Sequence, residues 1–238
     1  AAEHFVAPLT FATLTEHKVY SDTFYLENDS ATAHIDWARW PDVIVVCPAT
    51  ANTIGKIANG IADNAVTTTI MATTVPVVIC PAMNKEMYKN SCYQQNEKTL
   101  AETGYTIVTP GTGELACGET GEGRLAVKDD ILFAVYKTLF ARNDLDGLDI
   151  VVTAGPTHEA IDPVRFITNH SSGKMGYALA EQALFRGAKV TLISGPTQID
   201  PIPGIQIVPV VTADEMQKAV QTHLNTADVL VMAAAGSD

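Results

Sequence analysis

An asparagine stands where a strongly apolar segment gives way to a helix-like one. The segment "VPVVIC" (75–80) is typical of a buried strand, and "PAMNKEMY" (81–88) follows it with Asn84, Lys85 and Glu86. In α/β proteins, ligands bind where buried strands end. The amide can therefore hold a polar ligand group, or its oxygen can cap the following helix by accepting a backbone N–H. The local sequence leaves both interpretations open.

A second apolar segment also ends in hydroxyl and amide side chains. The run 42–49 leads into "TANTIGK", with Thr50, Asn52 and Thr53 at the turn from strand to helix. Backbone N–H groups at a helix N-terminus, together with such side chains, can hold an anion or a cofactor. Thr50 can equally serve as the helix cap, so the two interpretations stay open.

Two further segments carry residues suited to proton transfer. His34 lies in "ATAHIDWARWPD" (31–42), where a histidine among apolar residues is more often a core or surface residue than a catalyst. "GTGELACGETGEGRLA" (111–126) combines many glycines with Cys117. This composition predicts a flexible loop that closes over a ligand as a lid, with Arg124 available for an anionic group. The alternative is an ordinary mobile loop.

In the second half of the chain, a glycine-containing turn opens a helix. "SSGKMG" (171–176) supplies Ser171, Ser172, Gly173 and Lys174, which suit an anion at a helix N-terminus. It is not a P-loop, because Met follows the lysine where a P-loop has Ser or Thr. NAD is not expected, because the next strand ends in "LISGPT" without the required acidic residue. The alternative to anion binding is a helix cap with a glycine for tight packing.

The elements that position these residues alternate along the chain. Near-continuous apolar segments predict strands covered on both faces, at 42–49, 75–82, 105–111, 148–157, 188–197, 205–210 and 227–235. Segments with helical periodicity lie between them, at 49–60, 84–102, 127–142, 174–187 and 212–225. This alternation predicts an α/β fold with two doubly wound, Rossmann-like parallel sheets. The polar segment 141–149 predicts a boundary between domains 1–144 and 145–238.

Composition narrows the class of partner. The 238 residues are 47% hydrophobic and 18% charged, which suits a folded protein with a sizeable core. A formal net charge of −12 argues against nucleic acid or an anionic membrane surface as partner, although not against a small anionic ligand. No apolar run approaches about 18 residues, so no membrane span is expected.

The four cysteines predict a reducing, cytoplasmic setting. They form no C-x-x-C pair, and no His or Cys stands at zinc spacing from another. Cys47 and Cys80 end apolar segments and are expected to be small buried hydrophobes. The chain lacks an initiator Met and a signal peptide, and it ends where a strand should meet a loop. We therefore expect a fragment of a longer chain, cut at both ends.

Four motifs together make a family resemblance specific. The histidine of "ATAHI", then "PATANT", "PAMNKEMY" and "ACGETGEGR", stand in an order and spacing that resemble the phosphopantothenoylcysteine decarboxylases, flavoproteins of coenzyme A biosynthesis. The second half resembles phosphopantothenate–cysteine ligase, the domain fused to them in bacteria. Because the resemblance covers essentially the whole chain, it implies a flavodoxin-like FMN decarboxylase domain followed by the N-terminal part of a CTP-dependent ligase domain.

For the first domain, the resemblance implies FMN-dependent decarboxylation of 4′-phosphopantothenoylcysteine to 4′-phosphopantetheine. Oxidation of the cysteine moiety creates the electron sink that lets CO2 leave, and the electrons are then returned. By the same resemblance, His34 is the active-site histidine, Asn84 binds the substrate carboxylate and Cys117 protonates the enethiolate. The expected flavin contacts are Thr50, Ala51, Asn52, Thr53 and Met83.

For the second domain, the resemblance implies CTP-dependent ligation of 4′-phosphopantothenate with cysteine through an acyl-cytidylate. Asn169 would stabilise that intermediate, and Asp238 would bind Mg2+ near the nucleotide. The segment 171–174 resembles the cradle of the CTP triphosphate. The residues expected to line the nucleotide site are Gly155, Pro156, Ala233, Ala234 and Ala235.

The resemblance also implies that two segments of the family's sequence lie outside this chain, and that the protein forms a homo-oligomer. The family's flavin phosphate loop precedes residue 1 and its later lysine-bearing loop lies beyond residue 238, so this chain alone is expected to bind flavin poorly and to lack complete ligase activity. Family members build a homododecamer from decarboxylase trimers and ligase dimers. Two alternatives are a peptide cysteine decarboxylase, which the second domain disfavours, and a non-catalytic binding protein, which the joint presence of His34, Asn84 and Cys117 disfavours.

Overall fold

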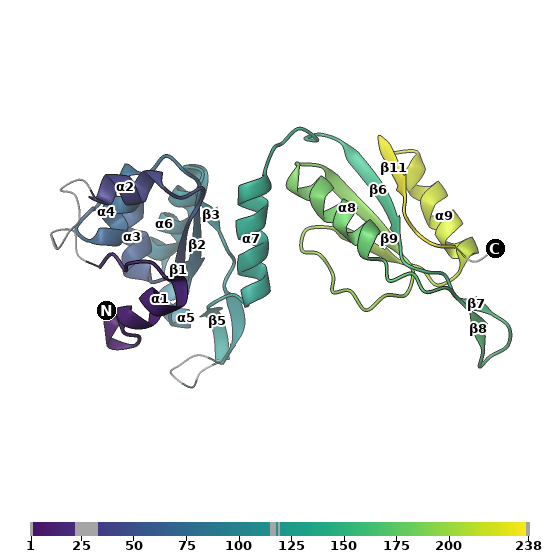
Figure 1. The fold of residues 1–238 in the computed structure, drawn as a ribbon, viewed down its shortest axis with the longest axis horizontal. Helices are drawn as coiled ribbons and strands as arrows, with labels where there is room; N and C mark the ends of the chain where they lie inside the picture. The colour runs from purple at the N-terminus through teal and green to yellow at the C-terminus, as the bar shows by residue number, and fades with distance from the viewer. Residues whose placement is uncertain (1, 22–32, 115–117, 119, 237–238) are drawn as a thin grey trace. The chain divides into compact units, whose positions relative to one another are not determined.

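The chain forms two compact units, Ala1–Leu139 and Phe140–Asp238. The computed structural model describes residues 2–21, 33–114, 118 and 120–236. Figure 1 shows the ribbon of each unit, with strands flanked by helices. Of the helices in the described residues, none is long and apolar enough to cross a membrane.

The first unit is built on a parallel sheet. Its strand order is β1-β2-β3, and the strands are β1 (Ile44–Ala49), β2 (Val77–Pro81) and β3 (Thr106–Ile107). β1 and β2 pair in parallel from Ile44 opposite Val77 to Ala49 opposite Pro81. An antiparallel hairpin follows, made of β4 (Gly111–Glu114) and β5 (Thr120–Arg124).

Helices cover both faces of β2, because its side chains alternate between two cores. Val77 and Ile79 pack in a core with Ile54 of α3 and Leu100 of α6. The intervening side chains of β2 enter the second core, which α7 covers. These helices are α3 (Ala51–Ala58), α6 (Ser91–Glu102) and α7 (Lys128–Phe140). The prediction of a strand buried on both faces is confirmed for β2.

Shorter helices complete the first unit. They are a 3-10 helix (Ala2–His4), α1 (Pro8–Thr15), α2 (Ala33–Arg39), α4 (Ala65–Ala72) and α5 (Lys85–Lys89). Asn64 begins α4 with a reciprocal capping box, in which its side chain accepts from the Thr67 N–H. Thr73, just after α4, donates its hydroxyl to the Ala38 carbonyl at 2.6 Å and so ties α4 to α2.

The second unit is a four-stranded parallel sheet with the strand order β10-β9-β6-β11. The strands are β6 (Asp149–Ala154), β9 (Lys189–Ser194), β10 (Gln206–Pro209) and β11 (Val229–Met232). α8 (Lys174–Phe185) covers one face and α9 (Ala213–Leu224) the other. Counted from β6, this order is 3-2-1-4, the order of Rossmann folds, in which ligands bind where the winding reverses. That switch point lies between β6 and β11.

The α/β class with Rossmann-like parallel sheets is therefore confirmed, but three local expectations are wrong. The predicted helix 84–102 is interrupted at Asn90, whose side chain accepts from the Cys92 N–H and begins α6. The segment 111–126 is not a loop throughout, since its described residues form the β4–β5 hairpin. Cys80 is buried as expected, whereas Cys47 is exposed.

Candidate ligand sites at the strand ends

The carboxyl ends of β1 and β2 lie side by side and bring two predicted segments together. The Ala82 N–H donates to the Ala49 carbonyl at 2.9 Å. Directly after Ala49, the Thr50 hydroxyl caps α3 by accepting from the Thr53 N–H at 3.3 Å. Thr50 and Asn52 are exposed, while Ala51 and Thr53 are half-buried. The capping interpretation of Thr50 is confirmed, and its exposure leaves the helix N-terminus accessible.

Asn84 has the capping role that the sequence allowed. Its side-chain oxygen accepts from the Glu86 N–H at 2.8 Å and begins α5. The residue is half-buried at the end of the β2 strand. Its role toward a substrate carboxylate stays a prediction.

The β4–β5 hairpin packs against the loop that carries Asn84. The Met83 N–H donates to the Gly123 carbonyl at 2.9 Å. Gly123 has φ +115°, and a Cβ there would lie 2.5 Å from the Met83 carbonyl oxygen, so no side chain fits. On the same strand, a Cβ on Gly121 would meet the Lys85 side chain at 3.0 Å. The hairpin is thereby fixed to the strand end through close backbone approach.

Of the two site residues predicted in this segment, the structure describes Arg124 but not Cys117. Arg124 is exposed, and its guanidinium crosses the hairpin, with one nitrogen 3.1 Å from where a Cβ on Gly113 would lie. Cys117 falls between β4 and β5 in the sequence and lies outside the described residues. Its predicted role as a proton donor therefore stays a prediction.

His34 lies on a different part of the first unit from Asn84. It is a half-buried residue of α2, the helix that packs against α4. Figure 1 shows α2 and α5 at opposite ends of this unit. The structure therefore groups Thr50, Met83 and Asn84 at one edge of the sheet, whereas His34 is not part of that group.

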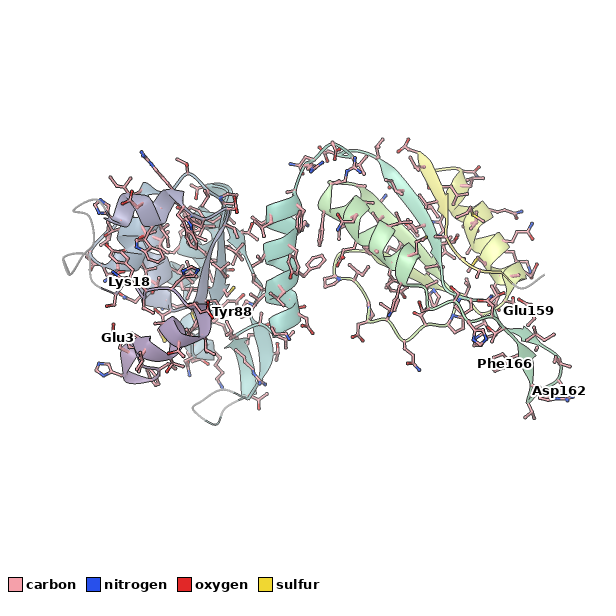
Figure 2. All side chains as sticks on the ribbon, in the orientation of Figure 1. Glu3, Lys18, Tyr88, Glu159, Asp162 and Phe166 are labelled. Atoms are coloured by element: carbon pink, nitrogen blue, oxygen red, sulfur yellow. The ribbon has the colours of Figure 1, made fainter. Side chains whose placement is uncertain are left out.

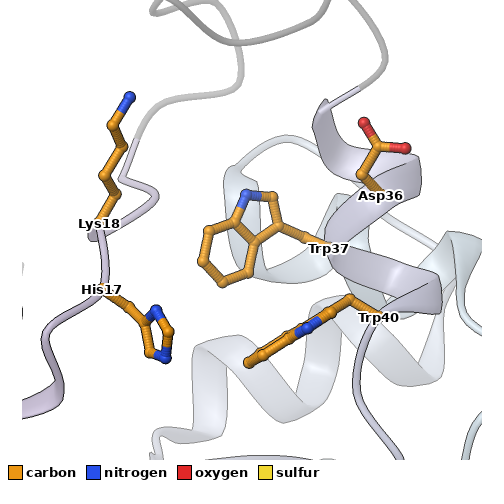
Figure 3. A pocket seen from close by; sticks show the side chains of 5 residues that line it. All are labelled: His17, Lys18, Asp36, Trp37 and Trp40. Carbon is orange, nitrogen blue, oxygen red and sulfur yellow. The ribbon is translucent and has the colours of Figure 1, made fainter.

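An aromatic cavity beside α2 was not predicted. Its volume is about 320 Å3, and Figure 3 shows its walls, which are His17, Lys18, Asp36, Trp37 and Trp40. The Trp37 and Trp40 rings are 6.0 Å apart and nearly perpendicular. Tyr20 stacks on Trp37 with the ring centroids 5.9 Å apart. The two tryptophans in "DWARW" could have indicated an aromatic cavity. The position of His17 beside them could not be predicted from the sequence.

The thiol at the end of β2 is poorly suited to nucleophilic chemistry. Burial, together with the neighbouring Cys47, raises the pKa of the Cys80 thiol to about 12. A thiol with so high a pKa stays protonated near neutrality, and the thiolate is the reactive form. Cys80 therefore acts as a small core residue, as the sequence indicated.

In the second unit, the switch point brings the predicted nucleotide-site residues together. The Ala235 N–H donates to the Gly155 carbonyl at 2.9 Å, and the Thr157 N–H donates to the Ala235 carbonyl at 3.2 Å. Pro156 and Ala235 form a parallel bridge beyond the ends of β6 and β11. Gly155 and Pro156 are buried, whereas Ala235 is half-buried.

A buried threonine organises the loop after β11. The Thr153 hydroxyl accepts from the N–H groups of both Ala233 and Ala234, each at 3.1 Å. Thr153 is fully buried, so its oxygen must find partners within the protein. Thr153 is not among the residues predicted from the sequence. The available signal was one hydroxyl inside an apolar strand, "DIVVTAG", where burial requires a hydrogen bond.

Asn169 links the same loop to the start of α8. Its side-chain amide donates to the Ala235 carbonyl at 2.8 Å, and its oxygen accepts from the Ser171 N–H at 2.9 Å. Gly173 begins α8 with φ +77° and is buried. Ser171 is half-buried, while Ser172 and Lys174 are exposed at the helix N-terminus. The predicted cradle and the predicted catalytic amide are thus neighbours.

The charged segment after β6 belongs to a small hairpin, β7 (Glu159–Ala160) and β8 (Phe166–Ile167), which Figure 2 shows with its side chains. Arg165 forms an exposed ion pair with Asp162 at 2.6 Å. A backbone N–H of Val164 and the Arg165 side chain hold the pKa of Asp162 below its usual value. Arg165 and Asp162 thus neutralise each other at the surface of this hairpin.

A metal site is not defined within the described residues. Asp238, the predicted ligand of Mg2+, lies outside them. Within the part of the chain that the structure describes, no group of three or more His, Cys, Asp or Glu side chains could hold a metal ion. The role of Asp238 toward Mg2+ therefore stays a prediction.

The fold and these strand-end sites define an α/β protein with two Rossmann-like units. The family model described as "Flavoprotein" matches residues 1–140, and the model described as "DNA/pantothenate metabolism flavoprotein C-terminal domain" matches residues 145–238. This chain belongs to the flavoprotein family. The family resemblance inferred from the four motifs is thereby confirmed.

Among curated proteins, the chain is similar to two coenzyme A biosynthesis bifunctional proteins CoaBC. The protein of Bacillus subtilis is 48% identical over 241 residues, which cover 100% of this chain and 59% of that protein. The protein of Escherichia coli is 40% identical over 238 residues, again 100% of this chain and 59% of that protein. The chain thus spans 59% of the length of these relatives.

Two solved structures each match part of the chain. The C-terminal domain of a CoaBC protein is 52% identical, covers 40% of this chain and 49% of that chain, and has a TM-score of 0.39. A PPC decarboxylase mutant complexed with pantothenoylaminoethenethiol is 34% identical, covers 57% of this chain and 79% of that chain, and has a TM-score of 0.47.

Proposed function

We propose that this chain serves coenzyme A biosynthesis with two activities. Residues 1–144 carry FMN-dependent decarboxylation of 4′-phosphopantothenoylcysteine to 4′-phosphopantetheine, and residues 145–238 carry part of a CTP-dependent phosphopantothenate–cysteine ligase. The observation that carries the proposal is the meeting of the Thr50 and Asn84 segments at adjoining strand ends, in a chain similar over its whole length to CoaBC proteins.

The residues present fit a bound FMN in part. The α3 N-terminus offers accessible neutral donors, Thr50 and Asn52, and Met83 lies at the next strand end. A helix N-terminus with hydroxyl and amide side chains suits the polar edge of a flavin or a phosphate. When bound, FMN supplies a two-electron oxidant that generates an electron sink beta to the substrate carboxylate.

Asn84 then positions the carboxylate that leaves as CO2. Its oxygen is held by the Glu86 N–H, which orients the amide at the strand end. A neutral amide holds a carboxylate without strongly favouring its charged ground state. A lysine there would stabilise that ground state and oppose the loss of CO2.

His34 and Cys117 complete the proposed decarboxylase site. We assign the histidine a place beside flavin and substrate, and the cysteine the protonation of the enethiolate intermediate, with Arg124 meeting an anionic group of the substrate. The helix that carries His34, α2, lies at the other end of the unit from α5. That separation supports an assembly of trimers in which neighbouring copies share a site, within the homododecamer that ligase dimers would complete.

In the second unit we propose that phosphopantothenate is activated by CTP. The substrate carboxylate attacks the α-phosphorus and releases pyrophosphate, and the cysteine amine then attacks the acyl-cytidylate and releases CMP. Ser171, Ser172, Gly173 and Lys174 would hold the triphosphate, with Gly155 and the Ala233–Ala235 loop along the nucleotide. Asn169 would stabilise the intermediate, and Asp238 would bind Mg2+. We place this metabolism in the cytoplasm, where the free thiols stay reduced.

A mass-spectrometric assay tests the decarboxylase. The purified full-length protein that contains this chain is mixed with FMN and 4′-phosphopantothenoylcysteine, with Asn84→Ala and Asn90→Ala as variants. Both asparagines cap a helix through the same type of hydrogen bond, so Asn90→Ala controls for the loss of a helix cap. The wild type and Asn90→Ala should yield a product lighter by one CO2, whereas Asn84→Ala should lose at least about a hundredfold in rate. Unchanged substrate with flavin demonstrably bound to the wild type would contradict the proposal.

A further inference from the structure

Three hydroxyl groups form a directional hydrogen-bond chain between α8 and the end of β9. Thr197 donates to the Tyr177 hydroxyl at 3.4 Å, and Tyr177 donates to the Ser194 hydroxyl at 3.2 Å. Ser194 donates in turn to the Gly195 carbonyl at 2.9 Å. Tyr177 is 7% and Ser194 5% exposed, so water does not replace these bonds readily. We call Thr197, Tyr177 and Ser194 the hydroxyl relay.

The Thr197 end of the hydroxyl relay covers two glycines of the proposed nucleotide site. A Cβ on Gly173 would lie 2.7 Å from the Thr197 methyl carbon, and a Cβ on Gly155 would lie 2.9 Å from it. The methyl group therefore occupies the space that two side chains would fill. Gly155 and Gly173 are also in near contact, at 3.4 Å between the Cβ position of Gly173 and the Gly155 Cα.

The motif Gly-Pro-Thr explains this geometry, since it occurs twice. It follows β6 as Gly155–Thr157 and β9 as Gly195–Thr197, and the two strands are paired neighbours with Ala154 opposite Ser194. The two turns therefore meet, and a Cβ on Gly195 would lie 1.8 Å from the Pro156 carbonyl oxygen. Thr197 is carried over the start of α8 by this second turn.

We propose that Tyr177 is a positioning residue of the nucleotide site, whose hydroxyl holds Thr197 against Gly155 and Gly173 and so sets the N-terminus of α8 relative to the switch point. The inference rests on the proposed CTP-dependent function of the second unit. Tyr177 lies one turn after Lys174, and it is buried rather than facing the ligand. Its hydroxyl thus acts on the triphosphate cradle through Thr197.

Two substitutions remove the hydroxyl relay without opening a cavity. Tyr177→Phe deletes one hydroxyl, and Thr197→Val keeps the methyl group over the glycines while deleting the other. Measured in the full-length protein that contains this chain, each should raise the KM for CTP about fivefold, the effect of one intramolecular hydrogen bond, and leave kcat within about twofold. Both substitutions break the hydrogen bond between Thr197 and Tyr177. The double variant should therefore have a KM for CTP no higher than that of Tyr177→Phe.

Two further variants serve as controls. Thr197→Ser keeps the hydroxyl and removes the methyl group, so it separates packing over the glycines from the hydroxyl relay. Tyr105→Phe removes a hydroxyl from a half-buried tyrosine of the first unit and should leave the KM for CTP unchanged. Thermal unfolding of every variant confirms that it is folded before its kinetics are compared.

The measurement distinguishes failure of this inference from failure of the proposed function. An unchanged KM for CTP in Tyr177→Phe, or independent effects of the two substitutions in the double variant, would overturn the positioning role. If the wild type neither binds nor turns over CTP, the proposed function fails instead. In that case amide hydrogen exchange of residues 171–177 decides, since Tyr177→Phe should accelerate it several-fold there. Unchanged exchange would overturn the inference.

Discussion

The two units place their candidate sites at the same position in the fold but hold them in different ways. In the second unit, Thr153 and Asn169 together make four hydrogen bonds that join the ends of β6 and β11 to the start of α8. In the first unit, Thr50 and Asn84 are held by helix caps, and the rest of the predicted site comes from α2 and the β4–β5 hairpin. One site is organised within its own sheet, whereas the other is divided among separate elements.

This difference has a functional consequence. A preorganised polar site costs little reorganisation when its ligand binds, which suits the stabilisation of a charged intermediate. A site divided among separate elements suits a ligand as large as a flavin, which must enter before the remaining groups close on it. We therefore expect substitutions at the site of the second unit to act mainly on stability. Substitutions at the site of the first unit should act mainly on activity.

The largest stability effect should come from Gly195→Ala. A Cβ there would lie 1.8 Å from the Pro156 carbonyl oxygen, and backbone cannot move aside as a flexible side chain can. We expect a loss of about 3 kcal/mol or more in the free energy of unfolding, measured by urea denaturation. Gly236→Ala is the matched control, because nothing lies within 4 Å of its Cβ position. Equal stability of the two variants would mean that the two Gly-Pro-Thr turns do not constrain each other.

A smaller effect should follow from Thr153→Val, which keeps the shape of the side chain. The substitution leaves the N–H groups of Ala233 and Ala234 without their acceptor, and each unsatisfied buried donor is costly. We expect a loss of about 2 kcal/mol in urea denaturation, with Thr153→Ser close to wild type. Near wild-type stability of Thr153→Val would show that this loop finds other partners and is not organised by the threonine.

The smallest effect on stability should come from removing a helix cap, which can be compared at Asn84 and Asn90. Asn84→Ala and Asn90→Ala each remove one side-chain acceptor from a helix N-terminus, at 2.8 Å and 2.9 Å respectively. Each should lower the free energy of unfolding by about 1 kcal/mol. A much larger loss at Asn84 would indicate that its side chain also holds the first unit together, which would weaken its assignment to the substrate.

Long apolar segments predicted the fold well because burial on both faces leaves a strong signal. β2 and β6 were found in this way, and the glycine-opened α8 begins at Lys174 as expected. The β4–β5 hairpin was missed because glycines give no apolar alternation, and its position depends on the Met83 contact with Gly123. Such tertiary backbone contacts leave no trace in local periodicity.

For the candidate sites too, local patterns in the sequence predicted some residues, whereas tertiary contacts determine the others. Residues at strand ends were correctly placed, since parallel strands deliver their carboxyl ends to one edge of a sheet. Thr153 and the hydroxyl relay were not foreseen, because their partners are distant in sequence: Thr153 bonds Ala233, and Tyr177 bonds Ser194. Which partner a buried hydroxyl bonds depends on how distant segments pack together. The residues next to it in the sequence do not indicate that partner.

One experiment tests the central claim that the two units carry two successive activities. The full-length protein that contains this chain, and its Asn84→Ala variant, are each supplied with 4′-phosphopantothenate, cysteine, CTP, Mg2+ and FMN, and the products are followed by mass spectrometry. We predict that the wild type forms the ligated acid and converts it to a product lighter by one CO2, whereas Asn84→Ala accumulates the ligated acid. Absence of the ligated acid in both, or formation of the lighter product by Asn84→Ala, would contradict this account.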